Sequence, residues 1–365
     1  MDLCYKPDWE ETKKSMAAWW AHEDIGRCAL SVTAERKDAT RIAPPPLPEI
    51  IADRWLDFDY WCAAQEYTMQ RTFYGGEAIP VWNPGDGWIH MAGFLGCPIE
   101  LREDTGWPGP ILEQGDLTGY DYHKITIDPD NPWWKFSEKM HCCAVRASRG
   151  KSIPGIQALG GCGDTLAQLR GNQPLLFDVM DCPEYVREFD QHLMKQWIEA
   201  YEKFFQITRE GAEGATTWPS THIWAPGRFY FPMCDFSYMI STRMYTDLFL
   251  PSLEMQVNYL DYSLYHLDGV GAFKHIDVIL ELPKLNGVQV VPGDGKPNAL
   301  YFMDLLKKIQ RAGKNLWISL PPEDVEIALE NLSAKGLFIN TSCETEEEAQ
   351  ELLKKVAKIS KGVMA

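Results

Sequence analysis

The sequence predicts an α/β protein, a (β/α)8 barrel of the TIM type that carries an N-terminal helical, aromatic-rich extension. From about residue 150 onward, short apolar runs alternate with amphipathic helical segments, and the links between them are short. The later runs each end in a different cluster of polar residues and glycine, which is typical of the carboxyl-terminal rim of a barrel. No G-x-G-x-x-G sequence follows any run, so an open dinucleotide-binding sheet is not favoured.

The length of 365 residues suits such a barrel with one extension, so we expect two domains. Residues 1–75 are predicted to form a helical extension packed on the barrel, and residues 76–365 the barrel. In the extension, one helix is expected from residue 8 through Trp20 and a second from Glu49 through Tyr67. A proline-rich link separates them.

The segment from residue 75 to 134 is rich in turn residues, with a short strand candidate at residues 125–127. Four aromatic residues here are candidates for an aromatic pocket, with core packing as the alternative: Tyr74, Trp82, Trp88 and Trp107.

Strands and helices are expected to alternate over the rest of the chain. The predicted strands lie at residues 152–159, 214–220, 262–267, 288–291, 316–320 and 337–340. The predicted helices begin at Thr165 and at the Ser241 cap, or span residues 183–208, 273–280, 299–312, 322–332 and 345–359. Residues 175–180 either continue a helix or form a short strand.

Composition excludes several classes of protein. The formal charge of −17 and the pI of about 4.9 make nucleic acid and anionic membranes unfavourable partners. No run of about 18 apolar residues occurs, so no membrane span is expected. The N-terminus shows no basic segment followed by an apolar one, and the ten cysteines are scattered without a C-x-x-C pair. We therefore expect reduced thiols and a cytoplasmic protein.

His266 and Asp268 are the first candidates for a functional site. They are two residues apart at the end of a predicted strand, so both side chains face the same side and could bind a divalent metal or act as acid and base. A structural histidine is the alternative. Cys343 follows another predicted strand, and together with His266 it makes a zinc site plausible, although an inert buried cysteine is equally compatible. Glu281 is the remaining carboxylate that a metal could recruit.

His222 and Asp235 follow a further strand and are the predicted catalytic residues. His222 is expected to act on or orient the substrate, and Asp235 to be a base or, alternatively, a turn residue. Trp224, Gln289 and Asp294 are the predicted substrate-binding residues. The Gly-Asp-Gly sequence around Asp294 fits neither a phosphate-binding loop nor a dinucleotide fingerprint.

Three stretches resemble the uroporphyrinogen decarboxylase superfamily, and in particular its branch of cobalamin-linked methyltransferases. They are Cys-Asp-Phe-Ser-Tyr-Met-Ile-Ser at residues 234–241, Tyr-His-Leu-Asp-Gly at 265–269 and Val-Gln-Val-Val-Pro-Gly-Asp-Gly at 288–295. The resemblance implies a (β/α)8 barrel with its site at the carboxyl-terminal rim. The Arg-Gln-Ala-Gly-Arg motif of true uroporphyrinogen decarboxylases is absent, which argues against a tetrapyrrole substrate.

The methyltransferase branch holds zinc on a His-x-Cys pair and a distant cysteine. His266 matches the histidine and Cys343 the distant cysteine, while Asp268 stands where the middle cysteine is expected. The resemblance thus implies a methyltransferase that demethylates a small methylated compound, best an aryl methyl ether, with zinc as Lewis acid. The methyl group would pass to the cob(I)alamin of a separate corrinoid protein. The alternatives are a metal-independent decarboxylase, with Asp235 or His266 as proton donor, and a non-catalytic ligand-binding barrel.

Overall fold

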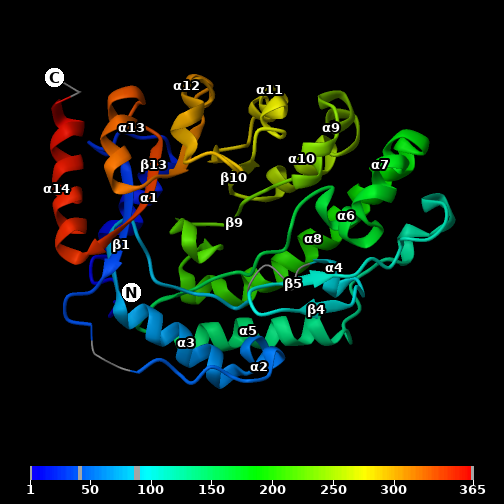
Figure 1. The fold of residues 1–365 in the computed structure, drawn as a ribbon, viewed down its shortest axis with the longest axis horizontal. Coiled ribbons are helices and arrows are strands. Elements are labelled where there is room, and N and C mark those ends of the chain that lie inside the picture. The colour runs from blue at the N-terminus through cyan, green and yellow to red at the C-terminus, as the bar shows by residue number, and fades with distance from the viewer. Residues whose placement is uncertain (1, 40–42, 86–90, 363–365) are drawn as a thin grey trace.

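A curled sheet of seven strands forms the framework of the computed structural model (Figure 1), which describes residues 2–39, 43–85 and 91–362. The strand order is β2-β1-β13-β12-β11-β10-β9. All neighbours are parallel except β2, which pairs antiparallel with β1 at one edge. The strands span Ala29–Glu35 (β1), Thr72–Gly76 (β2), Phe229–Tyr230 (β9), Tyr262–Asp268 (β10), Gly287–Val291 (β11), Asn315–Ser319 (β12) and Leu337–Thr345 (β13).

The central strands are buried along most of their length, as expected when helices cover one face of a parallel sheet and the other face is interior. In β11 and β12, every residue except the last is buried. In β10 the residues that remain partly accessible are Tyr262, His266 and Asp268, which share one face because side chains alternate along a strand. His266 and Asp268 therefore point to the same side, as the sequence predicted.

Shorter strand pairs accompany this sheet. β3 (Val81–Trp82) is parallel to β6 (Ile153–Pro154), and a parallel bridge joins Ile156 to Thr217, just after β7. The remaining pairs are antiparallel, namely β7 (Ala215–Thr216) with β8 (Trp224–Ala225), and β4 (Ile99–Leu101) with β5 (Gly106–Pro108). The described residues therefore form a mixed α/β structure, which confirms the predicted class at that level.

Helices alternate with the strands in the second half of the chain (Figure 1). They are α6 (Asp164–Arg170), α7 (Asn172–Asp181), α8 (Pro183–Ala212), α9 (Thr242–Leu248), α10 (Leu250–Tyr259), α11 (Ile276–Leu280), α12 (Met303–Arg311), α13 (Val325–Asn331) and α14 (Glu346–Gly362). Ser241 caps α9 as predicted, because its hydroxyl accepts a hydrogen bond of 3.2 Å from the Met244 N–H. Among the described residues, no helix is both long and apolar enough to cross a membrane.

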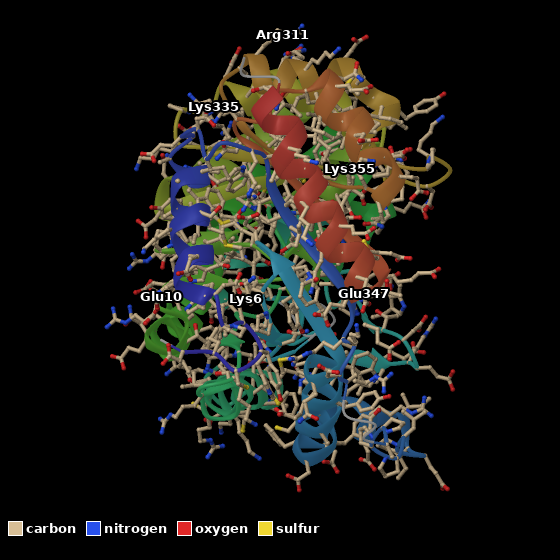
Figure 2. All side chains as sticks on the ribbon, turned by 90° about the vertical axis from the view of Figure 1, so that its left-hand side faces the viewer. Lys6, Glu10, Arg311, Lys335, Glu347 and Lys355 are labelled. Carbon is tan, nitrogen blue, oxygen red and sulfur yellow. The ribbon has the colours of Figure 1, made fainter. Side chains whose placement is uncertain are left out.

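The first 75 residues contain α1 (Trp9–Trp20), α2 (Ile51–Leu56) and α3 (Phe58–Arg71), but they are not purely helical as predicted. β1 lies inside the main sheet, between β2 and β13. Lys6 (Figure 2) fixes the start of the chain to β2: its buried ammonium donates to the backbone oxygens of Gly76 at 2.6 Å and Tyr74 at 3.1 Å. Figure 2 also shows α14 across these strands, and α14 contacts β1, β2 and β13.

Between residues 75 and 150, one predicted strand is wrong and two helices were not predicted. Residues 125–127 form no strand, since the chain there follows a short 3-10 turn and pairs with no neighbour. Helices α4 (Met91–Phe94) and α5 (Pro132–Ser148) were not predicted. Asn131 caps α5 by accepting from the Trp133 N–H at 2.8 Å, and α5 packs against α8.

Candidate functional site

A cavity of about 670 Å³ lies where the loops after β6, β7 and β9 meet. Its size is in the range of small-molecule sites. The wall combines aromatic and thioether side chains with two acids: Trp107, Trp218, Phe236, Met233, Asp164 and Asp235. No lysine or arginine lines it among the described residues. The cavity therefore favours a ligand that carries no negative charge.

Asp164 and Asp235 are the chemically distinctive pair in this wall. Asp164 begins α6 and accepts a hydrogen bond of 2.8 Å from the Phe236 N–H, so it holds the turn that carries Asp235. The Asp164 Oδ2 atom is buried with no hydrogen-bond partner among the described residues. Burial, and then the like charge of Asp235, raise the pKa of Asp164 well above its ordinary value.

Asp235 is the member of the pair that a ligand can reach, because its side chain stays exposed to the cavity. Protein surrounds the carboxyl group nonetheless, and this desolvation raises its pKa. The electrostatic effect of His266 lowers the pKa of Asp235, and the negative charge of Asp268 raises it further. A carboxyl group with a raised pKa in a cavity is suited to donate a proton.

A third acid, Asp190 on α8, lies behind Asp164. Its Oδ1 atom accepts a hydrogen bond of 2.7 Å from the Gly163 N–H, and so fixes the loop that presents Asp164. Gly163 has a φ of 71°, a left-handed conformation that glycine adopts without a steric cost. Asp190 is fully buried, and burial raises its pKa to about 7.

His266 is fixed by Gln289 on the neighbouring strand. The two residues are paired in register, and His266 Nδ1 lies 2.6 Å from Gln289 Oε1. Because an amide oxygen only accepts, the Nδ1 atom of His266 carries a hydrogen. The imidazole also contacts Trp218 edge to face, at 5.0 Å between ring centroids. Gln289 is buried and does not line the cavity, so the structure makes it a positioning partner of His266 and not the predicted substrate contact.

Cys343 is not brought to His266. Across the sheet, His266 is level with Gln289, Trp317 and finally Phe338 on β13. Cys343 lies five residues beyond Phe338, which places it about 16 Å farther along the strand direction. There β13 continues past the end of β12 and pairs only with β1, and Cys343 lines a separate hollow with Thr33.

The other predicted metal and substrate residues also lie outside the cavity. Glu281 is exposed at the end of α11. Because α11 runs from the carboxyl end of β10 back towards the start of β11, Glu281 lies at the opposite edge of the sheet from Asp268. Asp294 is exposed in the loop after β11. Trp224 is buried in the core, where its indole N–H donates to the Ala212 oxygen at 2.8 Å and its ring packs on Trp9.

His222 faces a second cavity instead of joining Asp235. Its Nδ1 atom donates to the Ile79 oxygen at 2.9 Å, and burial lowers its pKa to about 4. The second cavity, of about 430 Å³, also includes Tyr74 and shares Asn83, Pro219 and Ser220 with the wall of the first. The two predicted catalytic residues, His222 and Asp235, therefore line different cavities.

The predicted aromatic pocket is divided in the same way. Trp107 lines the first cavity and Tyr74 the second, while Trp82 is buried in the core. Trp88 lies outside the described residues.

No family model matches the chain, and no curated protein matches it either.

The predicted zinc ligands do not form a donor set in this arrangement. Among the residues that the structure describes, no three His, Cys, Asp or Glu side chains are grouped to hold a metal ion. His266 and Asp268 share a side of β10, but Cys343 and Glu281 lie elsewhere for the reasons above. Zinc remains a prediction from the resemblance, and no chemical step below depends on it.

Proposed function

We propose that the chain is a methyltransferase that removes the methyl group of a small, uncharged aryl methyl ether and passes it to the corrinoid of a partner protein. The family and the corrinoid acceptor rest on the sequence resemblance, as does a cytoplasmic location. The observation that carries the choice of substrate is Asp235, an accessible carboxyl group with a raised pKa in an aromatic cavity without lysine or arginine among its described residues.

The reaction needs one proton. When the bond between the ether oxygen and the methyl carbon breaks, the aryl group leaves as a phenolate unless its oxygen is protonated. A protonated Asp235 supplies that proton while the methyl group is transferred to the reduced corrinoid. Before the step, the same O–H group donates a hydrogen bond to the ether oxygen and so orients the substrate. Trp107, Trp218 and Phe236 offer faces and edges for the aromatic ring.

Decarboxylation fits this cavity less well. A carboxylate substrate has to be held by a cation or by several hydrogen-bond donors, since burying an unpaired charge is costly. The described wall contains no lysine or arginine to pair with a carboxylate, because its polar side chains are the two acids and the neutral groups of Asn83, Gln168, Asn172 and Ser220. The alternative decarboxylase is therefore not favoured.

The barrel is part of the proposal as well. β3, β6 and β7 run in parallel register through the pairing of Ile153 with Val81 and the bridge from Ile156 to Thr217. We propose that these three short strands and the five parallel strands β1 and β10 to β13 form a (β/α)8 barrel, to which the two-residue strand β9 is an addition. Their carboxyl ends carry the loops of the cavity, as expected for this fold.

The test is methyl transfer from a panel of methoxyphenols and anisoles to cob(I)alamin, followed by absorbance. Asp235→Asn should lower the rate about 100-fold or more, which is the usual contribution of a general acid. Asp304→Asn, an exposed acid on α12, is the matched control and should leave the rate unchanged. Because the protonated form is active, the rate should fall as the pH rises through the pKa of Asp235. No transfer from any member of the panel, or an equally active Asp235→Asn variant, contradicts the proposal.

Zinc is tested separately by metal analysis of the purified protein. Since Cys343 lies far along β13 from His266, Cys343→Ser should leave any bound zinc unchanged. A loss of zinc in this variant contradicts the placement of Cys343 outside the site.

A further inference from the structure

The second cavity has the features of a separate ligand site. It lies between β1, helix α3 and the turn of residues 219–221, and its volume of about 430 Å³ is sufficient for a small aromatic molecule. Apolar side chains such as Trp61, Met69 and Val81 form much of the wall. No acidic or basic side chain lines it among the described residues, apart from the neutral imidazole of His222.

His222 gives this cavity a directional polar group. Its Nδ1 atom lies 2.9 Å from the Ile79 oxygen and 3.3 Å from the Ile79 nitrogen. Because the carbonyl oxygen only accepts and is the nearer of the two, Nδ1 carries the hydrogen, and Nε2 carries the lone pair and acts as an acceptor. Nε2 has no hydrogen-bond partner among the described residues, unlike the buried His141, whose two ring nitrogens are both occupied, by the Ser137 oxygen and the Gln157 N–H. His222 thus retains one acceptor position in a mostly apolar cavity. Because its pKa is about 4, the imidazole remains neutral near pH 7.

The turn between the two cavities is held in an unfavourable backbone conformation. Trp218 and His222 flank it with φ values of 48° and 53°, in the left-handed region that costs a residue with a side chain about 1 kcal/mol or more. Hydrogen bonds from the sheet keep it in place: the Trp317 indole donates to the Thr221 oxygen at 3.1 Å, and Asn340 donates to the Ser220 oxygen at 3.3 Å. The conformation directs the Trp218 side chain to the first cavity and the His222 side chain to the second. Backbone strain that the surrounding structure maintains is often found at ligand sites.

We propose that the second cavity is a binding site for a small neutral phenol or aryl alcohol, whose hydroxyl group donates a hydrogen bond to His222 Nε2. The ring lies against Met69 and Trp61, and Tyr74, whose ring contacts that of His222 edge to face at 6.0 Å between centroids, also lines the cavity. The proposal does not depend on the methyl transfer in the first cavity.

Methionines distinguish the two cavities in an NMR experiment. Met69 lines only the second cavity, whereas Met233 and Met239 line only the first. In protein labelled with 13C at the methionine methyl groups, phenol should shift the Met69 signal, which a Met69→Leu variant assigns. Toluene has the same ring but no hydroxyl donor, and it should bind the Met69 site roughly threefold to tenfold more weakly, the usual value of one hydrogen bond.

Three further variants complete the test. His222→Phe keeps an aromatic ring but removes the acceptor, so phenol and toluene should then bind equally. Ala64→Phe on α3 fills the cavity and should abolish the Met69 shift, while Ala63→Phe, its exposed neighbour, should not. A phenol titration that moves only Met233 and Met239 overturns the proposal. So does a preference for phenol that survives in His222→Phe, provided that circular dichroism shows the variant folded.

Discussion

The buried acid Asp190 makes folding stability dependent on pH in a direction opposite to that of most carboxyl groups. Its pKa is about 7 in the folded protein, above the ordinary value of 3.8. The folded state therefore binds more protons than the unfolded state between these values, and stability falls as the pH rises through that window. Below about pH 4 the group is protonated in both states and has no effect.

The size of this effect follows from the same two values. Between pH 5 and pH 8, the ionisation of Asp190 should lower the free energy of unfolding by about 3 kcal/mol. Asp190→Asn keeps an oxygen that accepts from the Gly163 N–H and removes the titration. Between pH 5 and pH 8, the free energy of unfolding should therefore fall by about 3 kcal/mol less in the variant than in the unmodified protein.

The assay is urea unfolding at pH 5, 6, 7 and 8, with the free energy of unfolding extrapolated to water at each pH. Asp181→Asn, at the exposed end of α7, is the control, because an exposed carboxyl group contributes little to the slope. Equal pH dependence in the unmodified protein and in Asp190→Asn refutes the reasoning. In that case burial does not raise the pKa of Asp190, and the same explanation for the raised pKa of Asp164 and Asp235 is weakened.

Two further predictions concern β10, β11 and the loops that follow them. Gln289→Leu removes the acceptor of His266 Nδ1–H, so the imidazole should change tautomer, which is visible in its 15N chemical shifts. An unchanged tautomer contradicts the positioning role of Gln289. Gly293→Ala should cost about 1–3 kcal/mol more than Gly295→Ala in urea unfolding. Both glycines have positive φ, but only at Gly293 does an added Cβ approach another backbone atom, Gly269 Cα at 2.7 Å, so equal costs show that close approach is not what requires glycine there.

β10 and β11 were predictable because their sequences are largely apolar and are followed by glycine or polar residues. The strands that lead into the cavity loops were predicted less well, since β6 and β7 are two residues long where strands at 152–159 and 214–220 were expected. β10 and β11 lie within one residue of their predicted ends. β1 was missed for a physical reason. Its sequence, Ala-Leu-Ser-Val-Thr-Ala-Glu, is compatible with a helix, and what makes it a strand is pairing with β13, which comes about 300 residues later. Local patterns contain no information about that pairing.

The candidate site was predicted only in part, because the register of the paired strands decides which side chains lie close together. Asp235 and His266 are brought into electrostatic contact as expected. Cys343 is not, since β13 runs past β12 beside β1 and carries it away. Asp164 was missed although its sequence context held a signal: like Asp268, it comes at the end of a predicted strand and beside glycine.

Desolvation is the common cause of the charge state in both cavities, and it has a consequence for what each can bind. Burial raises the pKa of Asp164 and Asp235, and it lowers that of His222 to about 4. Burial thus disfavours the charged form of these side chains in both cavities. Small-molecule binding in either cavity should thus depend little on ionic strength, because neutral ligands have no charge to screen. The association with a charged partner protein, in contrast, should respond strongly to salt.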